Sequence, residues 1–193
     1  IAQENRLPFL HLVESAGANL LKYRVEDFIL GGGLFCGMTR LSAAGIPVVT
    51  VVHGSSTAGG AYMPGMSDYV VMVRGRAKAF LAGTALLKAA TGEDASEEEL
   101  GGAEMHATGS GLAEYLAEDD ADGIRLAREV LAKLDWNRDL RREQKSVAAP
   151  RRDIEELLGL VPLDTKKPYD VREVIARLVD GSDFLDFKPG YGV

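Results

Sequence analysis

A glycine turn directly after an apolar run is the feature that most constrains how this chain can fold. Residues 47–52, Pro-Val-Val-Thr-Val-Val, predict a buried strand, and residues 54–62, Gly-Ser-Ser-Thr-Ala-Gly-Gly-Ala-Tyr, predict a turn that leads into a helix. The paired glycines Gly59 and Gly60 let a ligand approach the backbone, and N–H groups at the head of a helix attract negative charge. This segment is therefore a candidate oxyanion hole, and a tight turn without a ligand explains the loop equally well.

Short apolar runs alternate with helical patterns through the first 136 residues. Leu34, Met38 and Leu41 recur at helical spacing and predict a helix that begins after the glycines at 31–33 and ends at Gly45. Strands that alternate with helices require crossover connections, which favour an α/β fold with a largely parallel sheet. The predicted strands are residues 8–13, 47–52, 69–73 and 79–81. Four further helices are predicted: a short one after the glycine turn, one that contains residues 86–90, one that begins at the capping box Ser96–Glu99, and one that contains residues 124–134.

Three segments are expected along the chain. Residues 1–136 form the main unit, and residues 137–168 are charged and punctuated by prolines, which predicts a linker. Residues 169–193 predict a helix that is capped by Asp170 and stopped by Gly181, followed by the start of a strand. Because the sequence does not begin with Met and ends within this apolar alternation, we expect it to be an excised piece.

Composition excludes several classes of protein. The 193 residues carry 22 basic and 29 acidic side chains, and this net charge of -7 argues against binding to nucleic acid or to an anionic membrane. The single cysteine, Cys36, cannot form an internal disulfide, and the sequence contains neither a signal peptide nor an apolar run long enough to cross a bilayer. We therefore expect a reducing compartment: the bacterial cytoplasm by default, with the mitochondrial matrix as the alternative.

Ser55, Ser56 and Thr57 are the hydroxyl residues closest to the candidate hole. Serine and threonine commonly cap the start of a helix, so capping is favoured over a nucleophilic role. Proteases of the Clp and signal-peptide-peptidase kind use a related turn and place their nucleophilic serine where this chain has Ala58. The alanine speaks against peptidase chemistry.

The three histidines, His11, His53 and His106, do not have the spacing of a metal site. His11 and His53 are predicted to be structural residues of strands. His106 lies in the glycine-rich segment 101–111, which predicts a loop, and its role stays open between loop structure and a binding site.

Two charged clusters have both a functional and a simpler interpretation. Arg76 and Lys78, together with Arg74, follow a predicted strand where they could meet phosphate groups, although a solvated strand end explains them more simply. The acidic cluster at 93–99 could mimic the carboxylate pair of a hydratase, but a capped and solvated helix start accounts for it.

Four segments taken together resemble a known family. They are residues 56–68, STAGGAYMPGMSD; residues 88–93, KAATGE; residues 100–106, LGGAEMH; and residues 170–177, DVREVIAR. In this order they resemble the carboxyltransferase β subunit of biotin-dependent acyl-CoA carboxylases, and above all its methylcrotonyl-CoA carboxylase branch. The resemblance covers nearly the whole chain.

The resemblance implies a crotonase/Clp-like α/β superhelix of ββα turns, of which this chain is the first half in a subunit of two halves. Residues 1–136 would be the acyl-CoA-binding half, and residues 169–193 would lead into the second. The backbone N–H groups of Gly59 and Gly60 would hold the thioester oxygen while a biotin anion removes the neighbouring proton and the enolate attacks CO2. The candidate substrate-binding residues around this pair of glycines are Thr57, Ala58, Ala61, Arg76, Lys78, Gly83, Thr84 and His106.

The cofactors and partners implied by the resemblance lie largely outside this chain. Carboxybiotin would arrive on a partner protein, ATP would be used only by the partner biotin carboxylase, and this chain would hold no metal. The subunit would form a homo-oligomer, with dimers inside a hexamer. Since the second half supplies the biotin site, the fragment alone is expected to be inactive.

The acyl substrate has several candidates. 3-Methylcrotonyl-CoA is expected first, with propionyl-CoA, acetyl-CoA or a longer acyl-CoA as alternatives, because two segments depart from the family pattern. Residues 84–85 are Thr-Ala where many relatives carry two prolines, and residues 28–33, FILGGG, are unlike the methylcrotonyl enzymes. A crotonase-type hydratase or isomerase and a non-catalytic assembly module are the competing functions.

Overall fold

The structure, a computed structural model, describes residues 1–134, 136 and 147–192. The chain divides into two compact units, residues 1–136 with 187–193, and residues 137–186. The sequence predicted a linker at residues 137–168 and a C-terminal segment at 169–193, and residues 137–146 of that linker lie outside the described residues.

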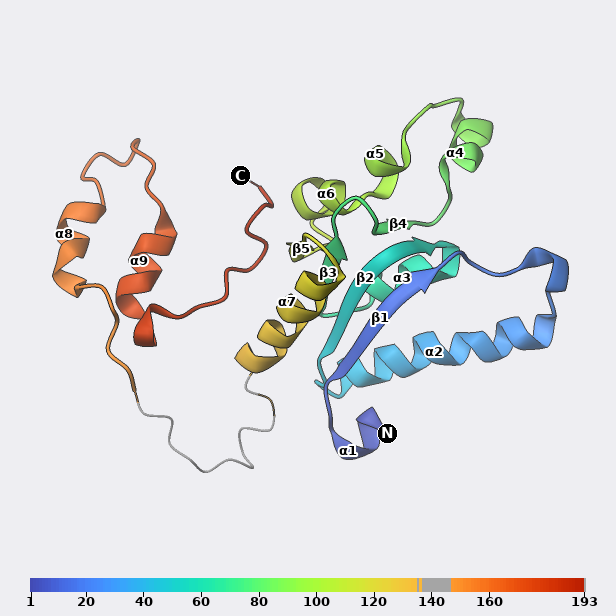
Figure 1. The fold of residues 1–193 in the computed structure, drawn as a ribbon, viewed down its shortest axis with the longest axis horizontal. Coiled ribbons are helices and arrows are strands. Elements are labelled where there is room, and N and C mark those ends of the chain that lie inside the picture. The colour runs from blue at the N-terminus through green and yellow to red at the C-terminus, as the bar shows by residue number, and fades with distance from the viewer. Residues whose placement is uncertain (135, 137–146, 193) are drawn as a thin grey trace. The chain divides into compact units, whose positions relative to one another are not determined.

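A parallel sheet with the order β1-β2-β3-β5 forms the centre of the first unit (Figure 1). Its strands pair in parallel throughout, and β4 pairs with the far end of β2. The strands are β1 (Phe9–Ser15), β2 (Val48–Thr57), β3 (Tyr69–Val73), β4 (Lys78–Phe80) and β5 (Tyr115–Ala117).

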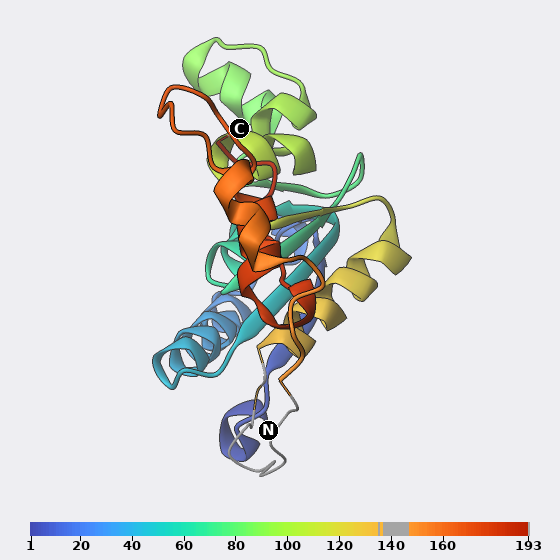
Figure 2. The same ribbon diagram turned by 90° about the vertical axis from the view of Figure 1, so that its left-hand side faces the viewer.

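Helices cover both faces of this sheet, which explains why β2 is apolar without alternation. Helix α7 (Asp120–Lys133) approaches one face closely, since a Cβ on Gly123 would lie only 3.1 Å from a methyl carbon of Val51. On the other face, Met38 of α2 (Val25–Ala43) packs with Val48 of β2. Figure 2 shows α2 in blue and α7 in yellow on opposite sides of the strands.

The remaining short elements of the first unit connect these layers. They are α1 (Ala2–Asn5), η1 (Leu20–Lys22), η2 (Ala58–Ala61), α3 (Tyr62–Gly65), α4 (Thr84–Thr91), α5 (Glu97–Gly101), α6 (Ala103–Met105) and the π-helical turn His106–Ser110. Two expectations are confirmed in detail. Ser96 and Glu99 form the capping box of α5, and α4 ends at Gly92, whose φ of 78° suits glycine.

Four boundaries differ from the prediction. Helix α2 starts at Val25 and runs through the three glycines, because its exposed first turns need no apolar periodicity. Strand β2 continues to Thr57, since β4 provides hydrogen-bond partners for its last residues. The predicted loop at 101–111 is largely helical, and the three-residue strand β5 is too short to leave a periodic signal.

The second unit contains η5 (Ile154–Glu156), α8 (Leu157–Leu160), α9 (Val171–Leu178) and η6 (Asp180–Ser182). Asp170 caps α9 as predicted, but the helix ends at Leu178, before Gly181. The buried Arg177 guanidinium joins α9 to η5, with Nε 3.0 Å from a carboxylate oxygen of Glu156. The strand expected after this helix is absent from residues 183–192, which the structure describes as irregular.

Candidate functional site

The chain reverses at the end of β2 through a strained alanine. Thr57 is still extended, whereas Ala58 has a φ of +53°, in the left-handed region that disfavours a side chain with a Cβ. The 3₁₀ turn η2 and the short helix α3 follow without interruption, so the glycine turn starts at Ala58 rather than at Gly54. Backbone strain of this kind often accompanies a functional site.

The two glycines of the turn meet very different surroundings. A Cβ on Gly60 would lie 2.8 Å from the Cβ of Ser15 on the neighbouring strand, so a larger residue requires the backbone to shift. A Cβ on Gly59 would lie 3.7 Å from the Phe35 ring, which is an ordinary contact. Close packing of β1 against the turn therefore requires glycine at position 60, while Gly59 faces open space beside Phe35.

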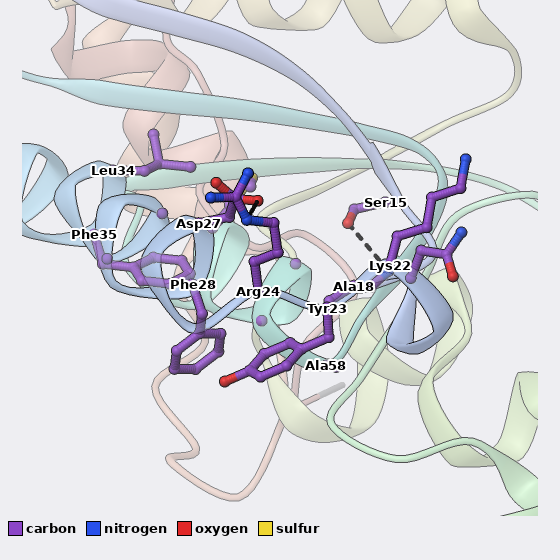
Figure 3. A pocket seen from close by; sticks show the side chains of 17 residues that line it. Ser15, Ala18, Lys22, Tyr23, Arg24, Asp27, Phe28, Leu34, Phe35 and Ala58 are labelled. Atoms are coloured by element: carbon purple, nitrogen blue, oxygen red, sulfur yellow. Dashed lines mark hydrogen bonds and ion pairs between the residues drawn. The ribbon is translucent and has the colours of Figure 1, made fainter.

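A cavity of about 680 Å3 opens beside this turn. Ala58, Gly59 and Gly60 line one part of it, and residues of η1 and α2 line the opposite part. Figure 3 shows the side chains that line it: the labelled apolar ones include Tyr23, Phe28, Leu34 and Phe35, and the charged ones are Lys22, Arg24 and Asp27. Met63 lines it as well. The cavity thus combines the backbone of a helical turn with an apolar wall, which is typical of small-molecule sites.

Two glycines of α2 leave free space along the side of the cavity that this helix lines. Gly31 and Gly32 line the cavity, and a Cβ on either would have no described atom within 4 Å. One helical turn beyond Gly31, the ring of Phe35 meets that of Tyr62 edge to face with centroids 5.6 Å apart. The cavity therefore has free space along α2 and is bounded by aromatic rings near the turn.

The structure brings together three of the residues that the sequence analysis placed at the site, namely Ala58, Gly59 and Gly60. Thr57 and Ala61 flank them in the chain. The remaining five, Arg76, Lys78, Gly83, Thr84 and His106, do not line the described cavity. Gly83 is the N-cap of α4 and Thr84 its first residue, so both belong to a separate element.

The two predicted phosphate-binding cations have acidic partners. Arg76 Nη1 lies 2.9 Å from Asp120 Oδ2, and Lys78 Nζ pairs with Glu97. Arg74 is paired as well, with Glu104 and with Glu118. Solvated ion pairs between neighbouring elements account for this basic triplet as the structure places it.

His106 is held through both ring nitrogens. Nε2 lies 2.7 Å from the carbonyl oxygen of Ala79, and Nδ1 lies 2.7 Å from Ser110 Oγ. The side chain is 8% exposed. In this position the imidazole joins the turn after α6 to β4 and presents no free nitrogen.

His11 belongs to a buried polar cluster instead of a metal site. Its Nε2 contacts Thr50 Oγ1, and that hydroxyl lies 2.6 Å from Ser67 Oγ. Burial lowers the pKa of the His11 imidazole below its ordinary value, because the charged form loses solvation. Burial therefore favours the neutral form of His11.

Sequence reasoning missed the side chains that form the cavity walls, above all Ser15, Tyr23 and Phe28. The acidic residues Glu26 and Asp27 in the first turn of α2 were the available signal, since carboxylates favour a helix start. Reading the helix from that point would have placed Phe28 on the same helix as Phe35.

Among the described residues, no three histidine, cysteine, aspartate or glutamate side chains gather as a metal site would require. In the same part of the chain, no helix has both the length and the apolar character needed to span a bilayer.

Comparison with known proteins gives a consistent result. A probable biotin-dependent acyl-coenzyme A carboxylase beta2 subunit of Mycobacterium tuberculosis is 57% identical over 192 residues, which is 100% of this chain and 36% of that protein. A mitochondrial methylcrotonoyl-CoA carboxylase beta chain of Dictyostelium discoideum is 45% identical over 194 residues, again all of this chain and 33% of that protein. The chain thus spans about a third of the length of these relatives.

Solved structures agree with these relatives. The β subunit of geranyl-CoA carboxylase from P. aeruginosa matches with a TM-score of 0.64 and 60% identity over 97% of this chain and 35% of that one. The transcarboxylase 12S hexamer, with methylmalonyl-coenzyme A bound, matches with a TM-score of 0.85 and 35% identity over 99% of this chain and 37% of that one.

The expected crotonase-like α/β carboxyltransferase fold is confirmed by these matches. The model of the carboxyl transferase domain family matches residues 1–193, the whole of the chain. The parallel sheet, the strained glycine turn at its edge and the relatives all agree with this match, and the chain belongs to the carboxyl transferase domain family.

Proposed function

We propose that this chain is the acyl-CoA-binding half of a carboxyltransferase that moves a carboxyl group from carboxybiotin to an acyl-CoA. The observation that carries the proposal is the placement of Gly59 and Gly60 at the edge of the apolar cavity. A thioester whose acyl chain enters the cavity can then direct its oxygen toward the backbone of the turn. Family membership supports the same reaction.

The chemistry requires stabilisation of an enolate more than it requires a side-chain base. When a proton leaves the α carbon of a saturated acyl-CoA, or the vinylogous γ carbon of an α,β-unsaturated one, negative charge develops on the thioester oxygen. N–H donors fixed beforehand stabilise that charge, and the same carbon then takes the carboxyl group. Each such donor contributes roughly 3–4 kcal/mol to transition-state stabilisation in comparable sites. Carboxybiotin on a partner supplies the carboxyl group, and ATP is consumed by the biotin carboxylase partner.

For the substrate we propose a branched α,β-unsaturated acyl-CoA. The methylcrotonoyl and geranyl carboxylases among the relatives support this class, and 3-methylcrotonyl-CoA is its smallest candidate. Gly31 and Gly32 leave space along α2 for a long acyl chain. This space favours an acyl group longer than 3-methylcrotonyl, and it disfavours acetyl and propionyl as the preferred substrates.

We also propose a homo-oligomer that works with a biotin-bearing subunit. The hexameric 12S relative supports the assembly of dimers within a hexamer. Helix α2 is consistent with a covered surface, because Ile29 and Leu30, next to the cavity-lining Phe28, are exposed in this chain. The compartment stays a proposal as well: a bacterial cytoplasm first, with the mitochondrial matrix as the alternative.

A substrate panel tests the proposal. The full-length subunit is assembled with its biotin-bearing partner, and ATP-dependent fixation of labelled bicarbonate is measured on acetyl-, propionyl-, 3-methylcrotonyl- and geranyl-CoA. We expect fixation on the two branched enoyl substrates. Fixation only on acetyl- or propionyl-CoA would retain the reaction and contradict the substrate class.

The same preparation separates the proposal from a hydratase. A hydratase needs a carboxylate near the acyl chain, and Asp27 is an acidic residue that lines the cavity. Hydration of an enoyl-CoA without biotin, lost in Asp27→Asn, together with no bicarbonate fixation by the assembled complex, would replace the carboxyltransferase with a hydratase.

A further inference from the structure

Serine hydroxyl groups, one buried and one half-buried, hold the helical turn Ala58–Gly65 at both of its ends. At the first end, Ser56 Oγ donates to the carbonyl oxygen of Gly60 over 2.9 Å. At the second end, Ser67 Oγ donates to the carbonyl oxygen of Met63 over 2.8 Å. The turn carrying the proposed oxyanion donors is therefore attached by side chains as well as by its own backbone.

Both attachments connect to strand β2. Ser56 and Thr50 both lie on β2 and are fully buried, and each meets the turn segment, Ser56 at the Gly60 carbonyl and Thr50 at Ser67. Thr50 Oγ1 lies 2.6 Å from Ser67 Oγ, and it also contacts Nε2 of His11, which is its register partner on β1. A rigid central strand thus fixes both ends of a short turn.

The hydroxyl hydrogens available at Thr50 and Ser67 determine which group donates and which accepts in the hydrogen bonds at the second end of the turn. A hydroxyl has one hydrogen to donate, and Ser67 uses its hydrogen on the Met63 carbonyl. Thr50 must then donate to Ser67, which leaves Thr50 to accept a hydrogen from His11. The chain therefore runs from His11 Nε2–H to Thr50, to Ser67 and to Met63, and His11 is the Nε2–H tautomer when neutral.

We propose that Ser56, Ser67 and Thr50 are positioning residues of the carboxyl transfer, which hold the Gly59–Gly60 turn in the geometry that stabilises the enolate, with His11 as the first donor of the chain. This role rests on the proposed function. None of these four side chains needs to touch the substrate. Their effect is expected on kcat, since a displaced turn weakens the transition state more than the binding of a long acyl-CoA.

The test uses single variants of the full-length subunit assembled with its biotin-bearing partner, under conditions in which carboxyl transfer limits the rate. Ser56→Ala and Ser67→Ala should each lower kcat about fivefold to tenfold, the size of one buried hydrogen bond, with KM for the acyl-CoA within about twofold. Thr50→Val should lower kcat as well, and Thr50→Ser should restore it because the hydroxyl remains.

A matched control and two double variants sharpen the test. Thr91→Val removes a threonine hydroxyl that also donates to a helical carbonyl, that of Leu87, and should leave kcat unchanged. The double variant Thr50→Val with Ser67→Ala should have a kcat no lower than that of the slower single variant, because both substitutions break the same chain of hydrogen bonds. In the double variant Ser56→Ala with Ser67→Ala, the two reductions in kcat should multiply, because the substitutions release opposite ends of the turn Ala58–Gly65.

Several results would overturn the proposal. If Ser56→Ala and Ser67→Ala lower the melting temperature but have the same kcat as the unaltered enzyme, these hydroxyls only stabilise the fold. Should Ser56→Ala fail to assemble, Ser56→Cys keeps the volume with a weaker donor, and an unchanged kcat there would count against the role equally. If the unaltered complex carboxylates no acyl-CoA, the proposed function fails and this role fails with it; a normal rate in the unaltered complex isolates the failure to the positioning residues.

Discussion

Gly60 and Gly31 both line the cavity, but their surroundings differ completely. A Cβ on Gly60 would meet Ser15 at 2.8 Å, whereas a Cβ on Gly31 would meet no described atom within 4 Å. The turn is packed against two strands, while the α2 wall is open. The same residue type therefore serves a fixed geometry in one region and free volume in the other, and substitution should affect the rate in the first and the range of substrates in the second.

The largest expected effect is on the packed turn. Gly60→Val cannot be accommodated without moving the turn away from β1, so kcat/KM for carboxylation should fall by at least about a hundredfold, the effect of losing one oxyanion donor. Gly65→Ala is the matched control, because a Cβ there has no described atom within 4 Å. Steady-state carboxylation kinetics of the assembled enzyme measure both, and equal rates would remove the distinction between the two regions.

The next effect tests the open wall. Gly31→Leu should fill part of the cavity and raise KM for geranyl-CoA about tenfold, with a smaller change for acetyl-CoA, since only the long chain needs that space. Gly33→Leu adds the same side chain to the same helix at a position that does not line this cavity. If both variants behave alike, the space along α2 does not hold the acyl chain.

Stability should change in opposite directions in the two regions. Gly32→Ala should stabilise α2 by about 0.5–1 kcal/mol, because alanine favours the helix interior. Gly60→Ala should destabilise the protein by about 1–3 kcal/mol through overpacking against Ser15. Melting temperatures of the assembled subunit report the signs, and a stabilising Gly60→Ala would show that the turn is not tightly packed.

The smallest expected effect is a pH dependence in the packed region. Because burial lowers the pKa of folded His11 below its unfolded value, the folded state disfavours the proton. The contribution of His11 to stability is therefore present above the unfolded pKa and is lost as the pH falls through the lower folded pKa. The melting temperature should drop below about pH 6.5 more steeply in the unaltered protein than in His11→Phe, and parallel curves would contradict the assignment.

Local patterns predicted much of this fold. The apolar runs located four of the five strands, and the Ser96–Glu99 capping box and Gly92 marked helix ends that depend only on neighbouring residues. Helix α2 was predicted too short, because Phe28, Ile29 and Leu30 are exposed and do not form a buried stripe in this chain. The segment 101–111 was predicted to be a loop because its glycines are typical of loops. In the structure it is largely helical, and the hydrogen bonds of His106 hold it.

The sequence by itself determined the parallel α/β class, the family and the glycine pair at the end of β2, since each depends on residues that are adjacent or regularly spaced. Only the tertiary structure decided that Gly60 packs against Ser15, that Arg76 and Lys78 pair with acidic side chains, and that His11 reaches Ser67 through Thr50. These contacts join residues that are distant in the chain, and only parallel strand register and packing bring them together.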